Sequence, residues 1–322
     1  MRTRWMFLCF LAVTTSICLG QSTQTTTPTA PTLTKMFAPY IDMGKPNNNL
    51  PQIMAASGIK YFTLGFVQSQ GCAASWFGTT PLDKEVVFTK YIEQVRAAGG
   101  EVIIAFGGWD GTDIAQACTD PATLQAAYQA VVDKYKAKIL DFDVEHLAIE
   151  DPASIDRRNI ALKALATANP GLQINYTLPA TPQGLTRESM IVITSAVKYG
   201  TPVTIVNLMT MDYGFPVPDG AMGVDSVSAL GAGWCQIKTA GLIARLGVTP
   251  MIGTNDTTTE TFTLADARAV LAYAQANPNI VGLLTFWSIS RDNGGCVATV
   301  SPTCSGIQQN AWDFSHIFSA FR

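Results

Sequence analysis

One pattern recurs along the chain from residue 36 onward: a short apolar run rich in β-branched residues, a loop, a helical pattern, and then glycine or Asn-Pro. We interpret eight apolar runs as strands: Met36–Met43, Ile59–Val67, Glu101–Phe106, Ile139–Asp143, Leu172–Leu178, Val203–Met211, Val248–Gly253 and Ile280–Trp287. Strands that are apolar on both faces are typical of a parallel sheet covered by helices.

Helical patterns lie between several of these runs, at Glu85–Ala98, Ala122–Ala137, Ser154–Ala168, Leu264–Ala276 and Gln308–Phe321. In the last of them Phe314, Ile317, Phe318 and Phe321 fall at i, i+3, i+4 and i+7, which makes one apolar stripe. Helix ends are indicated by Gly99-Gly100, Asn169-Pro170-Gly171, Gly200, Gly247 and Asn277-Pro278. The alternation predicts a single α/β domain, a closed (β/α)8 TIM barrel. An open dinucleotide-binding sheet is less favoured, because no Gly-x-Gly-x-x-Gly follows the first strand.

The first 35 residues do not share this pattern. Arg2 and Arg4 precede a mostly apolar run, Trp5–Val13, and small residues then lead to Gly20. This order predicts a signal peptide over residues 1–20, too short to span a bilayer. Residues 21–35 are rich in Thr and Pro, and we expect them to form a linker. The barrel domain is predicted over residues 36–322, and a signal peptide implies that it is secreted.

The cysteines fit an oxidising compartment. Cys296 and Cys304 are close enough in sequence to close a small loop, and Cys72 and Cys118 each follow an apolar strand, so we expect these two pairs to form disulfides. Cys235 lies among apolar positions of a helix and is expected to be a buried thiol.

Two glycosylation sequons are present. Asn175-Tyr176-Thr177 falls on a predicted buried strand, whereas Asn255-Asp256-Thr257 falls in a predicted loop. We expect Asn255 to be the better acceptor.

Composition narrows the function. With 48% hydrophobic and 14% charged residues, the 322-residue chain is globular, and a net charge of -3 gives no basic excess for nucleic acid. Only two histidines, His146 and His316, are present, so we expect no metal site and no cofactor. We further expect a monomer that binds neither nucleic acid nor membrane.

The fourth predicted strand carries the strongest chemical signal. Asp141, Asp143 and Glu145 alternate with apolar residues, so all three side chains point to the same face, into the barrel. Acids in an apolar lumen are costly unless they share protons or hydrogen bonds, and close acids shift each other's pKa, which suits one of them to general acid catalysis. A structural hydrogen-bond ladder or a cation site is the alternative.

At this point the sequence resembles the family 18 glycoside hydrolases, the chitinases and their relatives. Their fourth strand carries Asp-x-x-Asp-x-Asp-x-Glu, and this chain has Lys138 in place of the first acid, followed by the other three. The further landmarks are Ala105-Phe106-Gly107-Gly108 after strand three, Asn207-Leu208-Met209-Thr210-Met211-Asp212-Tyr213 at strand six, and Trp287 at strand eight. Leu140-Asp141-Phe142-Asp143 and Ser154-Ile155-Asp156-Arg157-Arg158-Asn159 look like the single-domain chitinase D-type branch.

The resemblance implies that the chain cleaves β-1,4 bonds between N-acetylglucosamine units with retention, without an enzyme nucleophile. It assigns Glu145 as the acid, Asp143 as the group that orients the substrate acetamide, Asp141 as the group that tunes Asp143, and Tyr213 as a hydrogen-bond donor to the acetamido oxygen. Met211 stands where the family usually has that tyrosine.

The same resemblance places sugar-binding residues at the strand ends. Trp287 would stack under the sugar, and Asp212 would bond a hydroxyl or Glu145. Position near the strand ends, rather than the resemblance, gives the remaining candidates: Met209 and Met211 as the floor, Gly107 and Gly108 beside the acids, and Trp109, Phe66 and Tyr40 along the cleft.

Three functions are open. A secreted chitinase acting on chitin or chito-oligosaccharides is favoured; an endo-β-N-acetylglucosaminidase on N-glycans uses the same acids, and a chitin-binding lectin on an inactive barrel belongs to another class. Such lectins generally lose the Glu or the Asp of the motif, and this chain keeps Glu145 and Asp143.

Overall fold

A computed structural model describes residues 35–45, 48–257 and 259–321 of the chain. The predicted signal peptide, and the predicted linker except for Lys35, lie outside these described residues.

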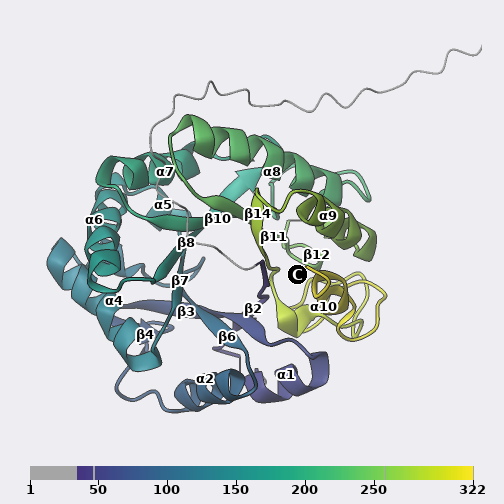
Figure 1. Cartoon of the computed structure of the whole chain (residues 1–322). Helices are drawn as coiled ribbons and strands as arrows, with labels where there is room; N and C mark the ends of the chain where they lie inside the picture. The colour runs from purple at the N-terminus through teal and green to yellow at the C-terminus, as the bar shows by residue number, and fades with distance from the viewer. Residues whose placement is uncertain (1–34, 46–47, 258, 322) are drawn as a thin grey trace, which may run out of the picture.

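The described chain forms one closed parallel barrel, as the alternation of strands and helices predicts (Figure 1). Its strands pair in the order β3 (Tyr61–Gln70), β6 (Glu101–Gly107), β7 (Ile139–Asp143), β8 (Gln173–Thr181), β10 (Val203–Met209), β11 (Arg245–Thr249) and β14 (Val281–Leu284). The first segment closes the ring, because β1 (Met36–Phe37) pairs with β14 and β2 (Tyr40–Asp42) pairs with β3.

Helices surround the barrel (Figure 1). They are α1 (Leu50–Ser57), α2 (Val87–Ala97), α3 (Ile114–Ala117), α4 (Pro121–Tyr135), α5 (His146–Ile149), α6 (Pro152–Ala168), α7 (Arg187–Tyr199), α8 (Met222–Thr239), α9 (Leu264–Ala276), α10 (Asp313–Phe318) and a 3-10 turn, η1 (Ile289–Arg291). Short additional strands are β4 (Ala73–Trp76), β5 (Thr80–Pro81), β9 (Gly184–Leu185), β12 (Gly253–Thr254) and β13 (Thr261–Phe262).

Apolar side chains pack on both sides of the barrel wall. The lower lumen is apolar and consists of Ala38, Ile103, Ile139, Ile205 and Leu283. On the outer face of the barrel, strand residues such as Leu140 and Phe142 pack with the helices in the main core. The polar strand residues therefore gather above the apolar layer, toward the carboxyl ends of the strands.

The structure corrects one predicted strand and one predicted helix end. β11 begins at Arg245 rather than at Val248, so Gly247 lies inside a strand and does not end a helix. A Cβ on Gly247 would lie 2.7 Å from Oδ1 of Asn207. Glycine is needed there for close strand contact and not for a cap.

The last helix is shorter than its apolar stripe predicts, because α10 covers only Asp313–Phe318. Trp312 has a left-handed φ of 68°, which stops the helix from extending toward residue 308. The buried carboxylate of Asp292 accepts hydrogen bonds from the first-turn N–H groups of Phe314 and Ser315 and fixes the start of the helix.

Both predicted disulfides form, between Cys72 and Cys118 and between Cys296 and Cys304. Cys235 is half-buried in α8 and takes part in a disulfide, so the predicted buried thiol is wrong. Disulfides are typical of extracellular proteins.

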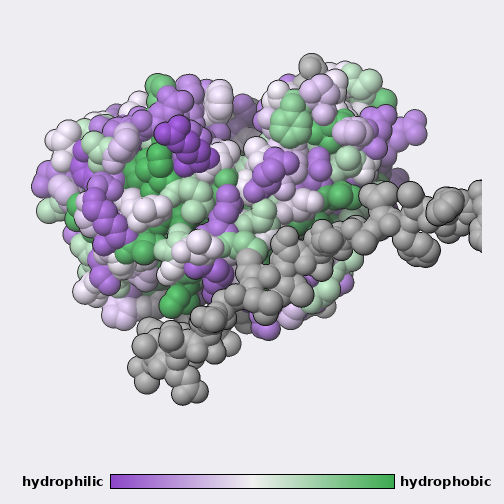
Figure 2. Space-filling view, turned by 90° about the horizontal axis from the view of Figure 1, so that it is seen from above, coloured by the Kyte–Doolittle hydropathy of each residue, from purple (hydrophilic) through white to green (hydrophobic). Residues whose placement is uncertain are grey.

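No helix among the described residues is long and apolar enough to cross a membrane. Polar and apolar side chains are interspersed on the face seen in Figure 2.

Candidate active site

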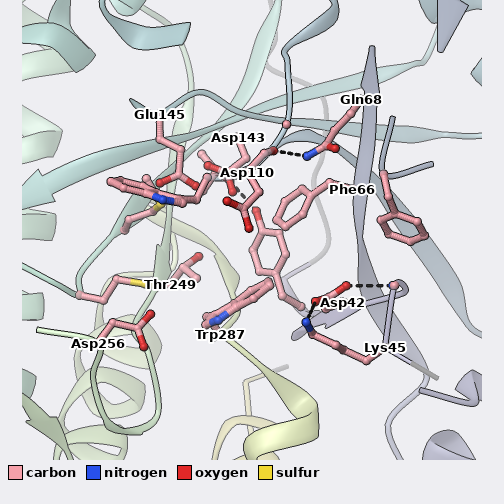
Figure 3. Close-up of a pocket in the computed structure, with 18 of the residues that line it drawn as sticks. Asp42, Lys45, Phe66, Gln68, Asp110, Asp143, Glu145, Thr249, Asp256 and Trp287 are labelled. Carbon is pink, nitrogen blue, oxygen red and sulfur yellow. Dashed lines mark hydrogen bonds and ion pairs between the residues drawn. The ribbon is translucent and has the colours of Figure 1, made fainter. Parts of the chain in front are cut away.

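A cleft of about 740 Å³ opens where the carboxyl ends of the strands meet (Figure 3). Most of its lining residues lie at or just beyond a strand end, and the carboxylates among them are Asp42, Asp110, Asp143, Glu145, Asp212 and Asp256. Lys45 also lines the cleft, and its Nζ lies 3.6 Å from Asp42 Oδ2. The cleft is therefore strongly acidic.

Asp141 lies at the base of this site, 2% exposed. Its carboxylate accepts hydrogen bonds from Tyr40 Oη at 2.6 Å and from Thr177 Oγ1 at 2.8 Å. Thr177 in turn accepts a bond from Nδ2 of Asn207 at 3.0 Å. Burial raises the pKa of Asp141 to about 7 against the opposing effect of these bonds. A polar network thus holds Asp141 in place below the cleft.

Asp143 lies one step higher on β7 and is 5% exposed. It lines the cleft, and its Oδ1 has no hydrogen-bond partner. Burial raises its pKa well above the usual range, and the charges of Glu145 and Asp141 add to this effect. A buried carboxyl group that lines a cavity and has an unpaired acceptor oxygen is suited to bind a donor on a ligand.

Glu145 follows β7 in extended conformation and lies directly before α5. Burial raises its pKa to about 7, and the charges of Asp212 and Asp110 add to this effect. Glu145 is therefore largely protonated below neutral pH, as a general acid must be. Figure 3 shows Glu145, Asp143 and Asp110 on the same side of the cavity.

Aromatic rings form the opposite wall. Trp287 lines the cleft and stacks on Phe66 with ring centroids 5.9 Å apart, and Tyr40 lies 6.0 Å from the Trp287 ring. The Trp287 ring is half-buried. A flat ring with one open face is suited to contact the apolar face of a sugar.

Glycines bring the loop after β6 close to the acids. Gly107 has a φ of 86°, and a Cβ on it would lie 2.1 Å from the Asp143 carbonyl oxygen. Gly108 has a φ of 82°, and a Cβ on it would lie 2.9 Å from the Phe66 ring. Gln68 donates Nε2 to the carbonyl oxygens of Gly107 and Asp110. This loop is thereby fixed beside β7.

Trp109 follows these glycines at the rim of the cleft, and 63% of its surface is exposed. One face of its indole stacks on His146, with ring centroids 4.6 Å apart and an interplanar angle of 11°. Trp109 therefore lines the cleft, and His146 covers one face of its indole.

The segment after β10 supplies Met209, Met211 and Asp212, all of which line the cleft. Asp212 has a left-handed φ of 48°, and its Oδ1 accepts the backbone N–H of Thr257 at 2.7 Å. Burial raises the pKa of Asp212.

Tyr213 does not line the cleft. Its ring stacks on Phe215 at 5.6 Å and packs against the main core, and its buried hydroxyl faces Ser226 and Thr210. The left-handed turn at Asp212 aims the next side chain behind the cleft. The geometry therefore corrects the predicted role of Tyr213 as a donor to the substrate.

Sequence reasoning also missed residues that line the cleft. Thr177 and Thr249 are inward positions of buried strands, and Gln68 lies one residue beyond a predicted strand, so strand alternation contains a signal for these three. Asp110 and Asp256 lie in irregular loops, where the spacing of residues along the chain gives no signal.

Asn255 is 0% exposed, with Nδ2 bonded to the carbonyl oxygens of Met251 and Gly253, so the predicted glycosylation at Asn255 is wrong.

Nothing in the described part of the chain is arranged to hold a metal, since no group of three or more His, Cys, Asp or Glu side chains has the needed geometry. The site is a stack of carboxyl groups with raised pKa values facing an aromatic wall in a (β/α)8 barrel. Such a site is typical of enzymes that act on sugars by acid catalysis.

Comparison with known proteins gives the family. The catalytic domain of a hyperthermophilic chitinase from Pyrococcus furiosus is 34% identical, with a TM-score of 0.81, over 91% of this chain and 96% of that domain. Catalytic-site mutants of active domain 2 of the Pyrococcus furiosus chitinase in complex with chito-oligosaccharides match at 33% identity, with a TM-score of 0.80, over 92% of this chain and 97% of that one. No protein-family model matches the chain.

Two curated proteins also match. The Escherichia coli K12 protein named "Probable bifunctional chitinase/lysozyme" is 34% identical over 89% of this chain, and "Endochitinase 11" of Metarhizium anisopliae is 34% identical over 80%. The chain spans 34% and 52% of the lengths of these two relatives.

The chain belongs to the family 18 glycoside hydrolases, the chitinase family.

Proposed function

We propose that the protein is a secreted chitinase that hydrolyses β-1,4-linked N-acetylglucosamine polymers or oligomers with retention of configuration. The observation that carries this proposal is the stack of Asp141 and Asp143 on β7 and Glu145 directly after it, with raised pKa values and an unpaired acceptor on Asp143. Membership of the chitinase family and the chito-oligosaccharide complexes of the Pyrococcus furiosus relative support it.

In the first step Glu145 donates its proton to the glycosidic oxygen, and the bond from that oxygen to the anomeric carbon breaks. The carbonyl oxygen of the substrate's own acetamido group attacks the anomeric carbon and gives an oxazolinium ion. Asp143 accepts the acetamide N–H and stabilises the positive charge, while the charge of Asp141 below it raises the pKa of Asp143.

In the second step Glu145, now a carboxylate, takes a proton from water. The water oxygen attacks the anomeric carbon from the face that the leaving group vacated, and the acetamide is restored. Two inversions at one carbon give net retention. Trp287 supports the sugar ring, and Met209, Met211, Asp212 and Tyr40 shape the subsite around it.

The test is hydrolysis of an N-acetylated chitohexaose, followed by NMR of the freshly formed anomers. We expect the β-anomer from the wild-type protein and loss of nearly all turnover in Glu145→Gln. Glu150→Gln is the matched control, because Glu150 is exposed at the end of α5 and makes the same chemical change five residues away. Initial formation of the α-anomer would refute retention.

Two other outcomes separate the alternative functions. Cleavage of N-glycans from a glycoprotein in preference to chitohexaose would indicate an endo-β-N-acetylglucosaminidase. Binding of chitohexaose without cleavage would indicate a lectin. The retained Glu145 and Asp143 favour the hydrolase.

Three finer assignments belong to the same proposal. The motif Leu140-Asp141-Phe142-Asp143 supports placement in the chitinase D-type branch, and the two disulfides support secretion. A barrel that contains its own cleft supports action as a monomer.

A further inference from the structure

Glu260 is a buried acid that the proposed mechanism does not use. It lies between β12 and β13, directly before Thr261, and is 0% exposed. Neither carboxylate oxygen has a hydrogen-bond partner of regular geometry. Burying a carboxyl group without a hydrogen-bond partner costs free energy, and Glu260 does not line the cleft either. We therefore asked which groups surround it.

The backbone around Asp212 forms part of these surroundings. The N–H groups of Asp212, Tyr213 and Gly214 face the Glu260 carboxylate and lower its pKa, while burial and the charge of Asp212 raise it, with a net value of about 7. Asp212 and Gly214 have left-handed φ angles of 48° and 76°. Successive N–H groups in such a turn form a concave site for an anion. The carboxyl group of Glu260 therefore lies near the turn that carries Asp212, on the side of its N–H groups.

The segment that carries Glu260 is itself held in place. Asn255 donates its backbone N–H to the carbonyl oxygen of Glu260 at 3.0 Å. The guanidinium of Arg291 donates to the carbonyl oxygens of Ile252 at 3.0 Å and of Thr254 at 2.5 Å. The same segment bonds Asp212 directly, through the N–H of Thr257. Glu260 is thus fixed on one side and faces a cleft residue on the other.

Asp212 connects this contact to the chemistry. Its carboxylate lines the cleft, and its charge is the largest contribution after burial to the raised pKa of Glu145. A displacement of Asp212 would therefore change the proton affinity of the group that protonates the leaving oxygen.

We propose that Glu260 is a positioning residue that holds the turn at residues 212–214 and so keeps the Asp212 carboxylate beside Glu145. The proposal deepens the function proposed above and rests on it. Glu260 itself contacts no substrate.

The ionisable groups around Glu260 are few. Asp212 and the Tyr213 hydroxyl face it from the segment after β10. Asp256 and Arg291 act on Asp212 from the β12–β13 segment and from η1, with opposite signs. None of these contacts replaces the carboxyl group of Glu260 at the turn.

Two conservative variants separate position from charge. Glu260→Gln keeps the length and an acceptor oxygen but removes the charge, whereas Glu260→Asp keeps the charge and withdraws the carboxylate by about 1.5 Å. We expect Glu260→Gln to keep kcat within about threefold, and Glu260→Asp to lower kcat about 10–100-fold with a smaller change in KM. Glu93→Asp is the control, since Glu93 is exposed on α2.

The pH dependence of kcat/KM for chitohexaose identifies the route through Asp212. In Glu260→Asp the basic limb of the profile is expected to move toward acid by about half a pH unit, because Glu145 loses part of the nearby negative charge. In an Asp212→Asn background the same change should leave that limb unmoved.

Three results would overturn the proposal: equal losses in the Gln and Asp variants, a normal profile for Glu260→Asp, or a shift that persists without Asp212. Circular dichroism confirms that each variant is folded, and if Glu260→Asp is unfolded while Glu260→Gln is native and active, the residue is structural and the proposal fails. Failure of the proposed function is a different result, since the wild-type protein would then not cleave chitohexaose.

Discussion

Replacing Glu145 by Gln should stabilise the protein at alkaline pH while abolishing its activity. The pKa of Glu145 rises from 4.5 to about 7 on folding, chiefly through burial. The folded state therefore binds the proton more tightly than the unfolded state, and the resulting stability is complete below pH 4.5 and is lost as the pH rises through 7. At about 1.4 kcal/mol per pH unit, the ionised side chain destabilises the fold by about 3 kcal/mol at pH 8.5 relative to pH 4.

Glutamine stays neutral at every pH, so Glu145→Gln avoids this loss. Urea unfolding at pH 4 and pH 8.5 measures the free energy of unfolding of both proteins and so the size of this loss. We expect the free energy of unfolding of the variant to exceed that of the wild type by about 2–3 kcal/mol at pH 8.5 and to match it at pH 4. Glu150→Gln, at an exposed position, is the control for the chemical change itself. An equal difference between wild type and Glu145→Gln at both pH values would refute the raised pKa and, with it, the assignment of Glu145 as the acid.

Two further substitutions test the limits of the site. Tyr213→Phe should change kcat for chitohexaose less than about threefold, because its hydroxyl lies outside the cleft; a loss of about 100-fold, typical for removal of a hydrogen bond to a developing charge, would restore Tyr213 to the site. Lys138→Asp should leave turnover within about tenfold of the wild type, since Lys138 is 71% exposed and pairs with Glu101 at 2.8 Å rather than with a residue of the cleft. A larger gain in turnover would show that this position takes part in catalysis.

Much of the fold follows from the chain's periodicity. The strand at residues 203–209 is predictable because both of its faces are buried, so that apolar residues occur on both faces. The length of the last helix is not predictable in this way. Its apolar stripe continues past the helix, while the helix start is set by Asp292, a contact over 22 residues.

Some residues of the site are predictable from the sequence and others are not, for the same reason. Asp141, Asp143 and Glu145 are predictable, because strand alternation fixes the direction of each side chain before any tertiary contact is known. Tyr213 is not, since one left-handed residue at Asp212 reverses its direction. The same turn creates the contact with Glu260, 48 residues away in the sequence, for which no local pattern exists.

The identity of the nucleophile is tested by comparing the cleavage of fully N-acetylated and fully deacetylated chitohexaose under the same conditions. The proposed nucleophile is the substrate's own acetamido group. If the acetamido group is the nucleophile, the first is cleaved rapidly with the help of an acid whose pKa is about 7, and the second is not cleaved, because an amine cannot form the oxazolinium ion. Cleavage of both at similar rates would contradict this assignment and require a carboxylate of the protein, such as Asp143, as the nucleophile.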